Sequence, residues 1–203
     1  MVLADQQALR KQLRASRRQL SSVQRKQFNH LIAQHIFLSA TFLRAKNIAC
    51  YLPIVRDGEV DLSAVIRAIW ATKKSCYLPV LKRIGSGERL WFARYDRHTP
   101  LEINRFGILE PVASGRMLLK GGQLDLVLAP LVGFDEQGNR IGMGGGFYDR
   151  SFSNLRYRQH WRKPRLLGVA YECQKAPTIV PNPWDVALDA VVTEAAIYFG
   201  KQR

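Results

Sequence analysis

The amino-terminal part of the chain alternates apolar and basic positions with the period of an α-helix. Leu9, Leu13 and Leu20 recur near helical spacing with basic residues between them, and this stretch contains no proline or glycine. Ser21 and Gln24 then have the spacing of a capping box, which satisfies backbone N–H groups where a helix begins. The second helix carries an apolar stripe of Phe28, Leu31, Ile32 and Ile36. The pattern predicts two helices within residues 1–45.

Beyond these helices, short apolar runs take over from the helical period. Residues 47–52 form a strand candidate, residues 62–73 an amphipathic helix, and residues 76–80 a second strand. A strand, a helix and a strand in this order are typical of a parallel unit. Further strands are predicted at residues 89–95, 124–128, 166–171, 190–192 and 196–199, a helix at 147–156, and a loop-rich stretch before Gly122. The whole pattern predicts one α/β domain, residues 1–203, on which the helical segment 1–45 packs.

The composition narrows the class of protein. With 203 residues, 47% hydrophobic and 23% charged, the chain has the make-up of a folded protein with a real core. Its longest apolar run, residues 126–134, contains a proline and a glycine and is far shorter than the roughly 20 residues of a membrane span. The amino terminus has no secretory pattern, and three cysteines make no disulfide framework. We therefore expect a cytoplasmic protein that does not span a membrane.

The charge is strongly positive and unevenly placed. Thirty-one basic and sixteen acidic residues give a net charge of +15. Residues 1–30 hold seven basic residues and one acidic residue, and residues 150–165 hold six basic residues and no acid. Such a field attracts an anionic partner, which charge alone leaves open among nucleic acid, a membrane surface and a phosphorylated metabolite. The alternative is that these residues form solvated faces that serve solubility.

One stretch concentrates glycine between a buried strand and a helix, at residues 130–150. It reads PLVGFDEQGNRIGMGGGFYDR, and α/β sheets place ligands beyond the carboxyl ends of their strands. Glycines let the backbone approach a ligand closely, and successive N–H groups cradle phosphate oxygens. Arg140 can add a charge-assisted hydrogen bond. The stretch is a candidate phosphate-binding loop; the alternative is that its glycines only make a turn.

This loop differs from two common nucleotide-binding patterns. No Gly-Lys-Ser/Thr follows at the Walker spacing, and Phe147 stands where a dinucleotide pattern beginning at Gly142 has its last glycine. A nucleotide bound here is therefore held in another way. The carboxylate of Asp149 repels a bare phosphate but suits a magnesium ion that bridges phosphate oxygens. The alternative role of Asp149 is to help start a helix.

The same stretch resembles the signature of the 5-formyltetrahydrofolate cyclo-ligases, also called 5,10-methenyltetrahydrofolate synthetases. The similarity continues through LRKQLRASRRQLS, YLPIVRDGEVDL, NRFGILEP and WDVALDAVVT, in the family's order and over nearly the whole chain. The resemblance implies an open, mainly parallel, three-layer Rossmann-like sheet flanked by helices. It also implies an enzyme that uses ATP and Mg²⁺ to convert 5-formyltetrahydrofolate into 5,10-methenyltetrahydrofolate, ADP and phosphate.

The implied reaction needs no protein nucleophile. A formamide carbonyl is a poor electrophile, so its oxygen must be activated before a ring closes on its carbon. By resemblance, the formyl oxygen attacks the γ-phosphorus of ATP, N10 of the folate adds to the activated carbon, and phosphate leaves. The protein then positions the reactants and stabilises charge. This agrees with a sequence that has no convincing Ser/His/Asp or Cys/His arrangement.

The resemblance places the ATP site on the first helix and on the glycine-rich loop. For ATP binding it implies Arg10, Arg14, Arg140, Ile141, Gly142, Met143, Gly144, Gly145, Gly146, Phe147 and Tyr148, and for catalysis Arg140, Tyr148 and Asp149. Two positions depart from the family, because Gln6 and Gly145 stand where members often have lysines. Either Lys11, Arg14, Arg150 or the basic segment 156–165 compensates, or ATP binds more weakly.

The resemblance also implies the metal and folate contacts. Mg²⁺ would be held by Asp149 and Asp189, and the folate would contact Leu52, Glu59, Phe106 and Phe147. A carboxylate at Glu59 suits the donor-rich edge of a pterin, and phenylalanines suit its rings. From position alone, a role as a strand-end cap explains Asp189 equally well. A role as a solvated turn residue likewise explains Glu59. The expected partners are ATP and the folate, whose polyglutamate form the basic surface would attract, and the expected state is a monomer.

A nucleic-acid-binding module is the rival interpretation. In LRYRQHWRKPR, Tyr157 and Trp161 are interleaved with basic residues, a composition that allows phosphate contacts together with base stacking. This function has no use for Asp149 or for four glycines in five positions. The long signature therefore favours the enzyme.

Overall fold

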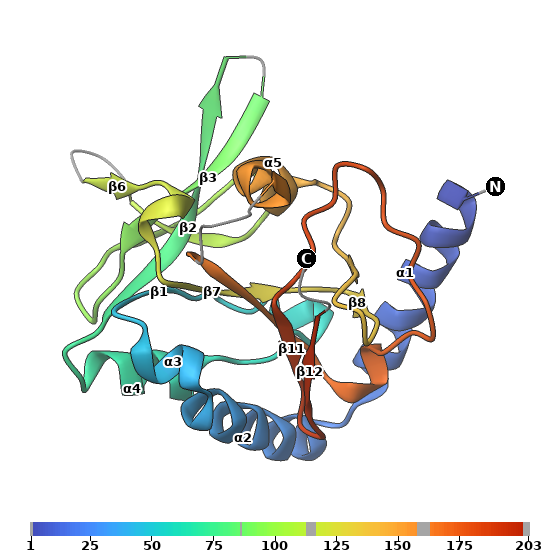
Figure 1. Cartoon of the computed structure of the whole chain (residues 1–203). Helices are drawn as coiled ribbons and strands as arrows, with labels where there is room; N and C mark the ends of the chain where they lie inside the picture. The colour runs from blue at the N-terminus through green and yellow to red at the C-terminus, as the bar shows by residue number, and fades with distance from the viewer. Residues whose placement is uncertain (1, 86, 113–116, 158–162, 201–203) are drawn as a thin grey trace.

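The computed structural model describes residues 2–85, 87–112, 117–157 and 163–200. An eight-stranded sheet runs through it in the order β12-β11-β10-β7-β1-β2-β3-β6 (Figure 1). Its strands are β1 (Asn47–Ala49), β2 (Ser75–Ile84), β3 (Gly87–Arg94), β6 (Leu118–Leu119), β7 (Leu126–Pro130), β10 (Arg165–Val169), β11 (Ala190–Val192) and β12 (Ile197–Phe199). The neighbours from β2 through β1, β7 and β10 to β11 pair in parallel, and β12, β3 and β6 pair antiparallel. The predicted mainly parallel α/β sheet is confirmed.

The second helix begins where the capping box predicts, and the helix predicted at 62–73 is present but ends at Trp70, while the short third helix was not predicted. α1 (Val2–Gln19) is followed by α2 (Ser22–Leu38), α3 (Ala40–Arg44) and α4 (Ser63–Trp70). The capping box of α2 is present, because Ser21 Oγ accepts the Gln24 N–H at 3.1 Å and Gln24 Oε1 accepts the Ser21 N–H at 2.9 Å. α4 joins β1 to β2, so the predicted parallel unit is also confirmed.

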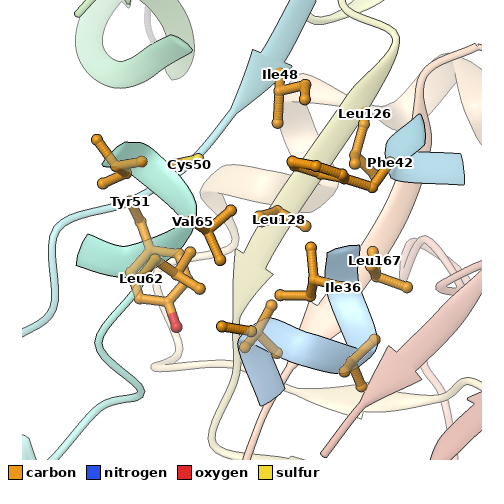
Figure 2. Close-up of a cluster of buried hydrophobic side chains, with 14 of the residues drawn as sticks. Ile36, Phe42, Ile48, Cys50, Tyr51, Leu62, Val65, Leu126, Leu128 and Leu167 are labelled. Atoms are coloured by element: carbon orange, nitrogen blue, oxygen red, sulfur yellow. The ribbon is translucent and has the colours of Figure 1, made fainter. Parts of the chain in front are cut away.

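Both faces of the central strands are buried, which explains their nearly continuous apolar sequence. Along β7, Leu126 and Leu128 belong to a core formed with α2 and α4, whereas Val127 between them belongs to a second core on the opposite face. Figure 2 shows the first of these cores, where Ile36 of α2 and Val65 of α4 lie near Leu128. The helices α2, α3 and α4 cover this face, and α5 (Phe147–Ser151) lies on the other side (Figure 1).

Several elements differ from the sequence-based prediction. The loop-rich stretch holds a hairpin of β4 (Leu101–Ile103) and β5 (Leu109–Pro111), and the glycine-rich stretch holds a second one of β8 (Gly133–Phe134) and β9 (Arg140–Ile141). These strands are too short to show an alternating pattern. The predicted helix at 147–156 divides into α5 and a 3-10 helix, η3 (Ser153–Tyr157). Shorter 3-10 turns are η1 (Val55–Asp57), η2 (Gly121–Gln123) and η4 (Glu172–Gln174).

α1 packs beside the carboxyl end of β7 rather than on a face of the sheet. Leu13, 5% exposed, forms a small core with Val132, Ile141, Ala176 and Ile179. The helix thereby lies next to the segment that follows β7, near β8 in Figure 1. Within the described parts of the chain, no helix is long and apolar enough to cross a membrane.

Candidate active site

A cavity of about 610 Å³ opens beyond the carboxyl ends of β1 and β7. Three parts of the chain line most of it: the turn after β1, the glycine-rich loop and the β4–β5 hairpin. The predicted site residues that line it are Arg14, Leu52, Glu59, Phe106, Arg140, Gly142, Met143, Gly145, Gly146, Phe147, Tyr148 and Asp149. Ligand sites of open α/β sheets lie at this end of the strands, so the location agrees with a functional cavity.

The glycine-rich loop, residues 142–146, joins β9 to α5 and presents its backbone to the cavity. Gly144 and Gly146 have φ angles of 99° and 60°, which side-chain-bearing residues rarely adopt. In the described part of the chain, the main-chain N–H groups of Met143 through Phe147 donate no hydrogen bond to another protein group. Consecutive N–H groups without a protein acceptor are able to bind anionic oxygens. Arg10 of α1 supports the loop, because its Nε donates to the Gly142 carbonyl at 2.8 Å.

Arg140 and Asp149 flank this loop and form an ion pair. Arg140 Nη2 donates to Asp149 Oδ1 at 2.5 Å, and the two side chains are 8% and 22% exposed. The Val186 N–H donates to the same oxygen at 3.1 Å, and its carbonyl accepts from Arg140. The loop therefore carries a carboxylate and a guanidinium in fixed positions, both beside the cavity.

Asp189 lies elsewhere. Its carboxylate accepts Arg165 Nη1 at 2.6 Å and the Leu166 N–H at 2.7 Å, at the amino-terminal end of β10 and β11. It does not line the cavity. Among the residues that the structure describes, no group of three or more His, Cys, Asp or Glu side chains is placed to hold a metal ion. The geometry thus gives Asp189 the strand-end role weighed from its position, and its metal role stays a prediction.

Glu59 lines the same cavity from a different part of the chain, the turn formed by residues 54–59. The side chain is 9% exposed, and its Oε2 accepts the Ile54 N–H at 2.9 Å. Burial raises the pKa of Glu59, although this hydrogen bond and the nearby Arg17 act to lower it. Glu59 is thus a buried acceptor at a cavity wall and not a solvated turn glutamate. Leu52 lines the cavity beside it.

Aromatic side chains complete the lining of this cavity. Phe106, from the turn of the β4–β5 hairpin, meets Phe147 edge to face with ring centroids 5.6 Å apart. Tyr148 follows Phe147 on α5, and burial, then the charge of Glu59, raises the pKa of its phenol. The phenol is therefore neutral at physiological pH and able to donate a hydrogen bond. The structure brings Phe106, Phe147 and Tyr148 to one cavity, and their roles toward folate and ATP stay predictions.

The remaining predicted residues stand back from the cavity. Ile141 is 3% exposed in the small core with Leu13, and neither it nor Gly144 lines the cavity. Gln6, which replaces a family lysine, donates its amide to the Val180 carbonyl at 2.8 Å. Tyr157 is 80% exposed, whereas Trp161 and the middle of the basic segment 156–165, residues 158–162, lie outside the described residues.

Some cavity residues are missed by sequence reasoning. They are Tyr51, Asp57, Arg18, Asn104 and Glu110. Asn104 donates its amide to Glu110 Oε2 at 2.9 Å, which links the turn of the β4–β5 hairpin to β5. Glu110 and Asn104 belong to the stretch NRFGILEP, and Asp57 to RDGEVDL, so the polar residues of these stretches were the available signal.

Comparison with known proteins gives one consistent result. The model of the 5-formyltetrahydrofolate cyclo-ligase family matches residues 2–194. A 5-formyltetrahydrofolate cyclo-ligase of Haemophilus influenzae is 38% identical over 184 residues, 90% of this chain and 94% of that protein. One from Escherichia coli K12 is 36% identical over 186 residues, covering 92% and 98%. The solved 5,10-methenyltetrahydrofolate synthetase of Aquifex aeolicus superposes with a TM-score of 0.79 at 28% identity, covering 98% of this chain and 94% of that one.

Proposed function

The chain belongs to the 5-formyltetrahydrofolate cyclo-ligase family, and we propose that it cyclises 5-formyltetrahydrofolate to 5,10-methenyltetrahydrofolate with ATP and Mg²⁺. ADP and phosphate are the other products. The observation that carries this proposal is that one cavity is lined both by a glycine-rich loop with unengaged amides and by a buried carboxylate, Glu59, from the turn after β1. A transfer between two bound molecules needs both walls in one cavity.

The glycine-rich loop is the proposed triphosphate side. Its amides and the guanidinium of Arg140 offer hydrogen bonds to anionic oxygens, and Arg10 braces the loop through the Gly142 carbonyl. Arg140 is already held in place by Asp149 and by the Val186 carbonyl, so it needs little reordering to offer a remaining N–H group to a phosphate. These groups support a role in stabilising charge on the transferred phosphoryl group.

Asp149 fits a magnesium ion that comes with the nucleotide. Mg²⁺ is usually held by one or two carboxylates together with phosphate oxygens and water, so a site with a single carboxylate suffices. Asp149 is the acidic side chain next to the loop, and its Oδ1 is already ordered by Arg140 and Val186. When bound, the ion would neutralise charge on the phosphates.

The turn that carries Glu59, together with the β4–β5 hairpin, is the proposed folate side. Glu59 is an acceptor for the N–H groups of the pterin, and the rings of Phe106 and Phe147 are apolar surfaces for its bicycle or for the aminobenzoyl ring. Leu52, Ile54 and Leu81 add apolar lining. Such a lining excludes water, which protects an activated formyl group from hydrolysis.

The proposed chemistry balances without a covalent protein intermediate. The formyl oxygen forms a bond to the γ-phosphorus while the bond to the bridging oxygen breaks and ADP leaves. N10 then bonds to the activated carbon, the carbon–oxygen bond breaks, and phosphate departs as the N10 proton is lost. The side chains hold the two reactants in line and bind the developing negative charge. The neutral phenol of Tyr148, a half-buried residue of α5 that lines the cavity, is a further donor for this charge.

The test is a three-component assay on the purified chain. With 5-formyltetrahydrofolate, ATP and Mg²⁺ together, we expect the methenyl chromophore and one ADP per methenyl formed; omission of any component abolishes both. ADP without methenyl product would retain the nucleotide side and remove folate as the substrate. If neither appears, a salt-dependent affinity for RNA or DNA becomes the next measurement. A cytoplasmic location and a monomeric state stay predictions from the sequence.

A further inference from the structure

A buried carboxylate, Asp57, receives several arginines of α1. Asp57 is 2% exposed, and Arg14 Nη2 donates to its two oxygens at 2.8 and 2.9 Å, while Arg18 pairs with the first of them. Arg17, 1% exposed, donates Nε to the Asp57 carbonyl at 2.9 Å and Nη1 to the Leu131 carbonyl at 3.2 Å. Residues three and four apart share one face of a helix, so a single face of α1 closes on Asp57.

Asp57 is part of the tight turn that carries Glu59. The Asp57 N–H donates to the Ile54 carbonyl and the Gly58 N–H to the Val55 carbonyl, both at 2.9 Å. Gly58 has a φ of 67°, and the Ile54 N–H closes the turn by donating to Glu59 Oε2 at 2.9 Å. Because the backbone from Ile54 to Glu59 is closed on itself, a contact that fixes Asp57 also fixes the Glu59 carboxylate.

The arginine cluster around Asp57 contributes little net stability for the charge that it buries. Among the described residues, Arg17 Nη2 and Arg14 Nε are buried without a hydrogen-bond partner. Buried ion pairs are often matched or surpassed in stability by apolar side chains of similar volume, since desolvation offsets their attraction. Stability alone therefore does not account for three arginines at this position. Their directional hydrogen bonds do account for it, because they define where the turn stands.

We propose that Asp57 is a positioning residue, which Arg14 and Arg18 hold so that Glu59 faces the bound folate. The inference rests on the proposed function, because Glu59 matters only if folate binds on that wall. It also changes the role expected of Arg14. Its guanidinium is engaged by Asp57, so it acts on the folate side and not on the phosphates of ATP.

The pH dependence of the folate KM distinguishes a positioning role of Asp57 from a purely structural one. Arg17 and Arg14 of α1 lower the pKa of Glu59, and Asp57 raises it. The other titratable neighbours are Tyr51 and Tyr148, both neutral phenols. Asp57→Asn leaves the arginines uncompensated and lowers the pKa of Glu59, whereas Arg14→Gln raises it. The pH at which the folate KM begins to rise on acidification therefore shifts in opposite directions in the two variants.

The experiment compares Asp57→Asn, Arg14→Gln and Arg18→Gln with the wild type, with Lys26→Gln as the control. Lys26 is an exposed residue of α2 and its loss removes one positive charge without touching the cluster. We expect Asp57→Asn and Arg14→Gln to raise the KM for 5-formyltetrahydrofolate about tenfold, the effect of losing a charge-assisted hydrogen bond. The KM for ATP changes less than about threefold, and Lys26→Gln behaves as wild type. Asp57→Glu partly restores the folate KM.

The outcomes are separable. An Arg14→Gln protein that weakens ATP and leaves the folate KM unchanged would return Arg14 to the phosphate site and overturn the inference. So would a folded Asp57→Asn protein with wild-type KM and pH profile. If Asp57→Asn fails to fold, Arg14→Gln and Arg18→Gln carry the test, because these side chains are 32% and 51% exposed. A wild-type chain without folate-dependent turnover would remove the proposed function itself.

Discussion

The two walls of the cavity are built in different ways. The proposed triphosphate side is a continuous run from Arg140 to Asp149, in which backbone amides, a guanidinium and a carboxylate follow one another along the chain. The proposed folate side combines the turn at residues 54–59, the β4–β5 hairpin and a face of α1. A wall formed by consecutive residues can be recognised in the sequence as a motif. A wall assembled from distant segments leaves only single residues to be noticed, and its geometry depends on how the segments pack.

The largest expected effect on turnover comes from Asp149, at the end of the continuous run 140–149. We predict that Asp149→Asn lowers kcat by about 100-fold or more, because the charge that balances a cation at the phosphates is lost. The asparagine can still accept the Val186 N–H, so the free energy of unfolding falls by about 1 kcal/mol or less. Steady-state assay and thermal denaturation check the two expectations. Wild-type turnover in this variant would contradict the metal assignment of Asp149.

On the assembled wall, Glu59→Gln is expected to raise the folate KM about 30-fold with little change in the KM for ATP, since a hydrogen bond to a charged acceptor is lost. Because burial raises the pKa of Glu59, the wild-type folate KM should rise as the pH falls, starting above the usual pKa of a glutamate. This rise of the folate KM at low pH is absent in Glu59→Gln. A KM change for ATP alone would refute the division into two walls.

The same raised pKa of Glu59 means that its ionised form disfavours folding at neutral pH, so Glu59→Gln should unfold at a higher temperature than the wild type.

The conformation of the loop gives a smaller, nucleotide-specific effect. Gly146→Ala places a Cβ at a φ of 60°, which strains the loop backbone, whereas the contact at 3.0 Å with Arg150 Nη1 is relieved by movement of that flexible side chain. We expect the KM for ATP to rise about tenfold and the folate KM to stay within about threefold. Gly122→Ala is the matched control, because it adds a methyl group in open space away from the cavity. Equal effects of the two substitutions on ATP would show that the loop backbone does not bind phosphates.

The smallest expected effect concerns the aromatic contact between the walls. Phe106→Ala removes an aromatic side chain from the cavity lining; a contact between its ring and a bound aromatic ring is worth about 1 kcal/mol, which predicts a rise of about fivefold in the folate KM. Ile103→Ala, 70% exposed on the same hairpin and outside the cavity lining, is the control. The measurement is the folate KM at saturating ATP. If both variants resemble the wild type, Phe106 is a packing residue and not a wall of the folate site.

Much of the fold follows from local signals. The capping box at Ser21 sets the start of α2, and nearly continuous apolar runs such as β7 predict a sheet buried on both faces. The hairpins β4–β5 and β8–β9 escape such reasoning, because strands of two or three residues carry no period. Phe106 and Glu110 reach the cavity only through the first of these hairpins.

The sequence by itself determined the family, the mainly parallel sheet and the glycine-rich loop, since each depends on residues close together in the chain. The tertiary structure decided which charges meet. Arg14 lies on Asp57, 43 positions along the chain, and Asp189 lies on Arg165 at the edge of β10 and not in the cavity. Both outcomes depend on long-range packing. A charged side chain pairs with whichever opposite charge the fold buries beside it, and no local pattern encodes that neighbour.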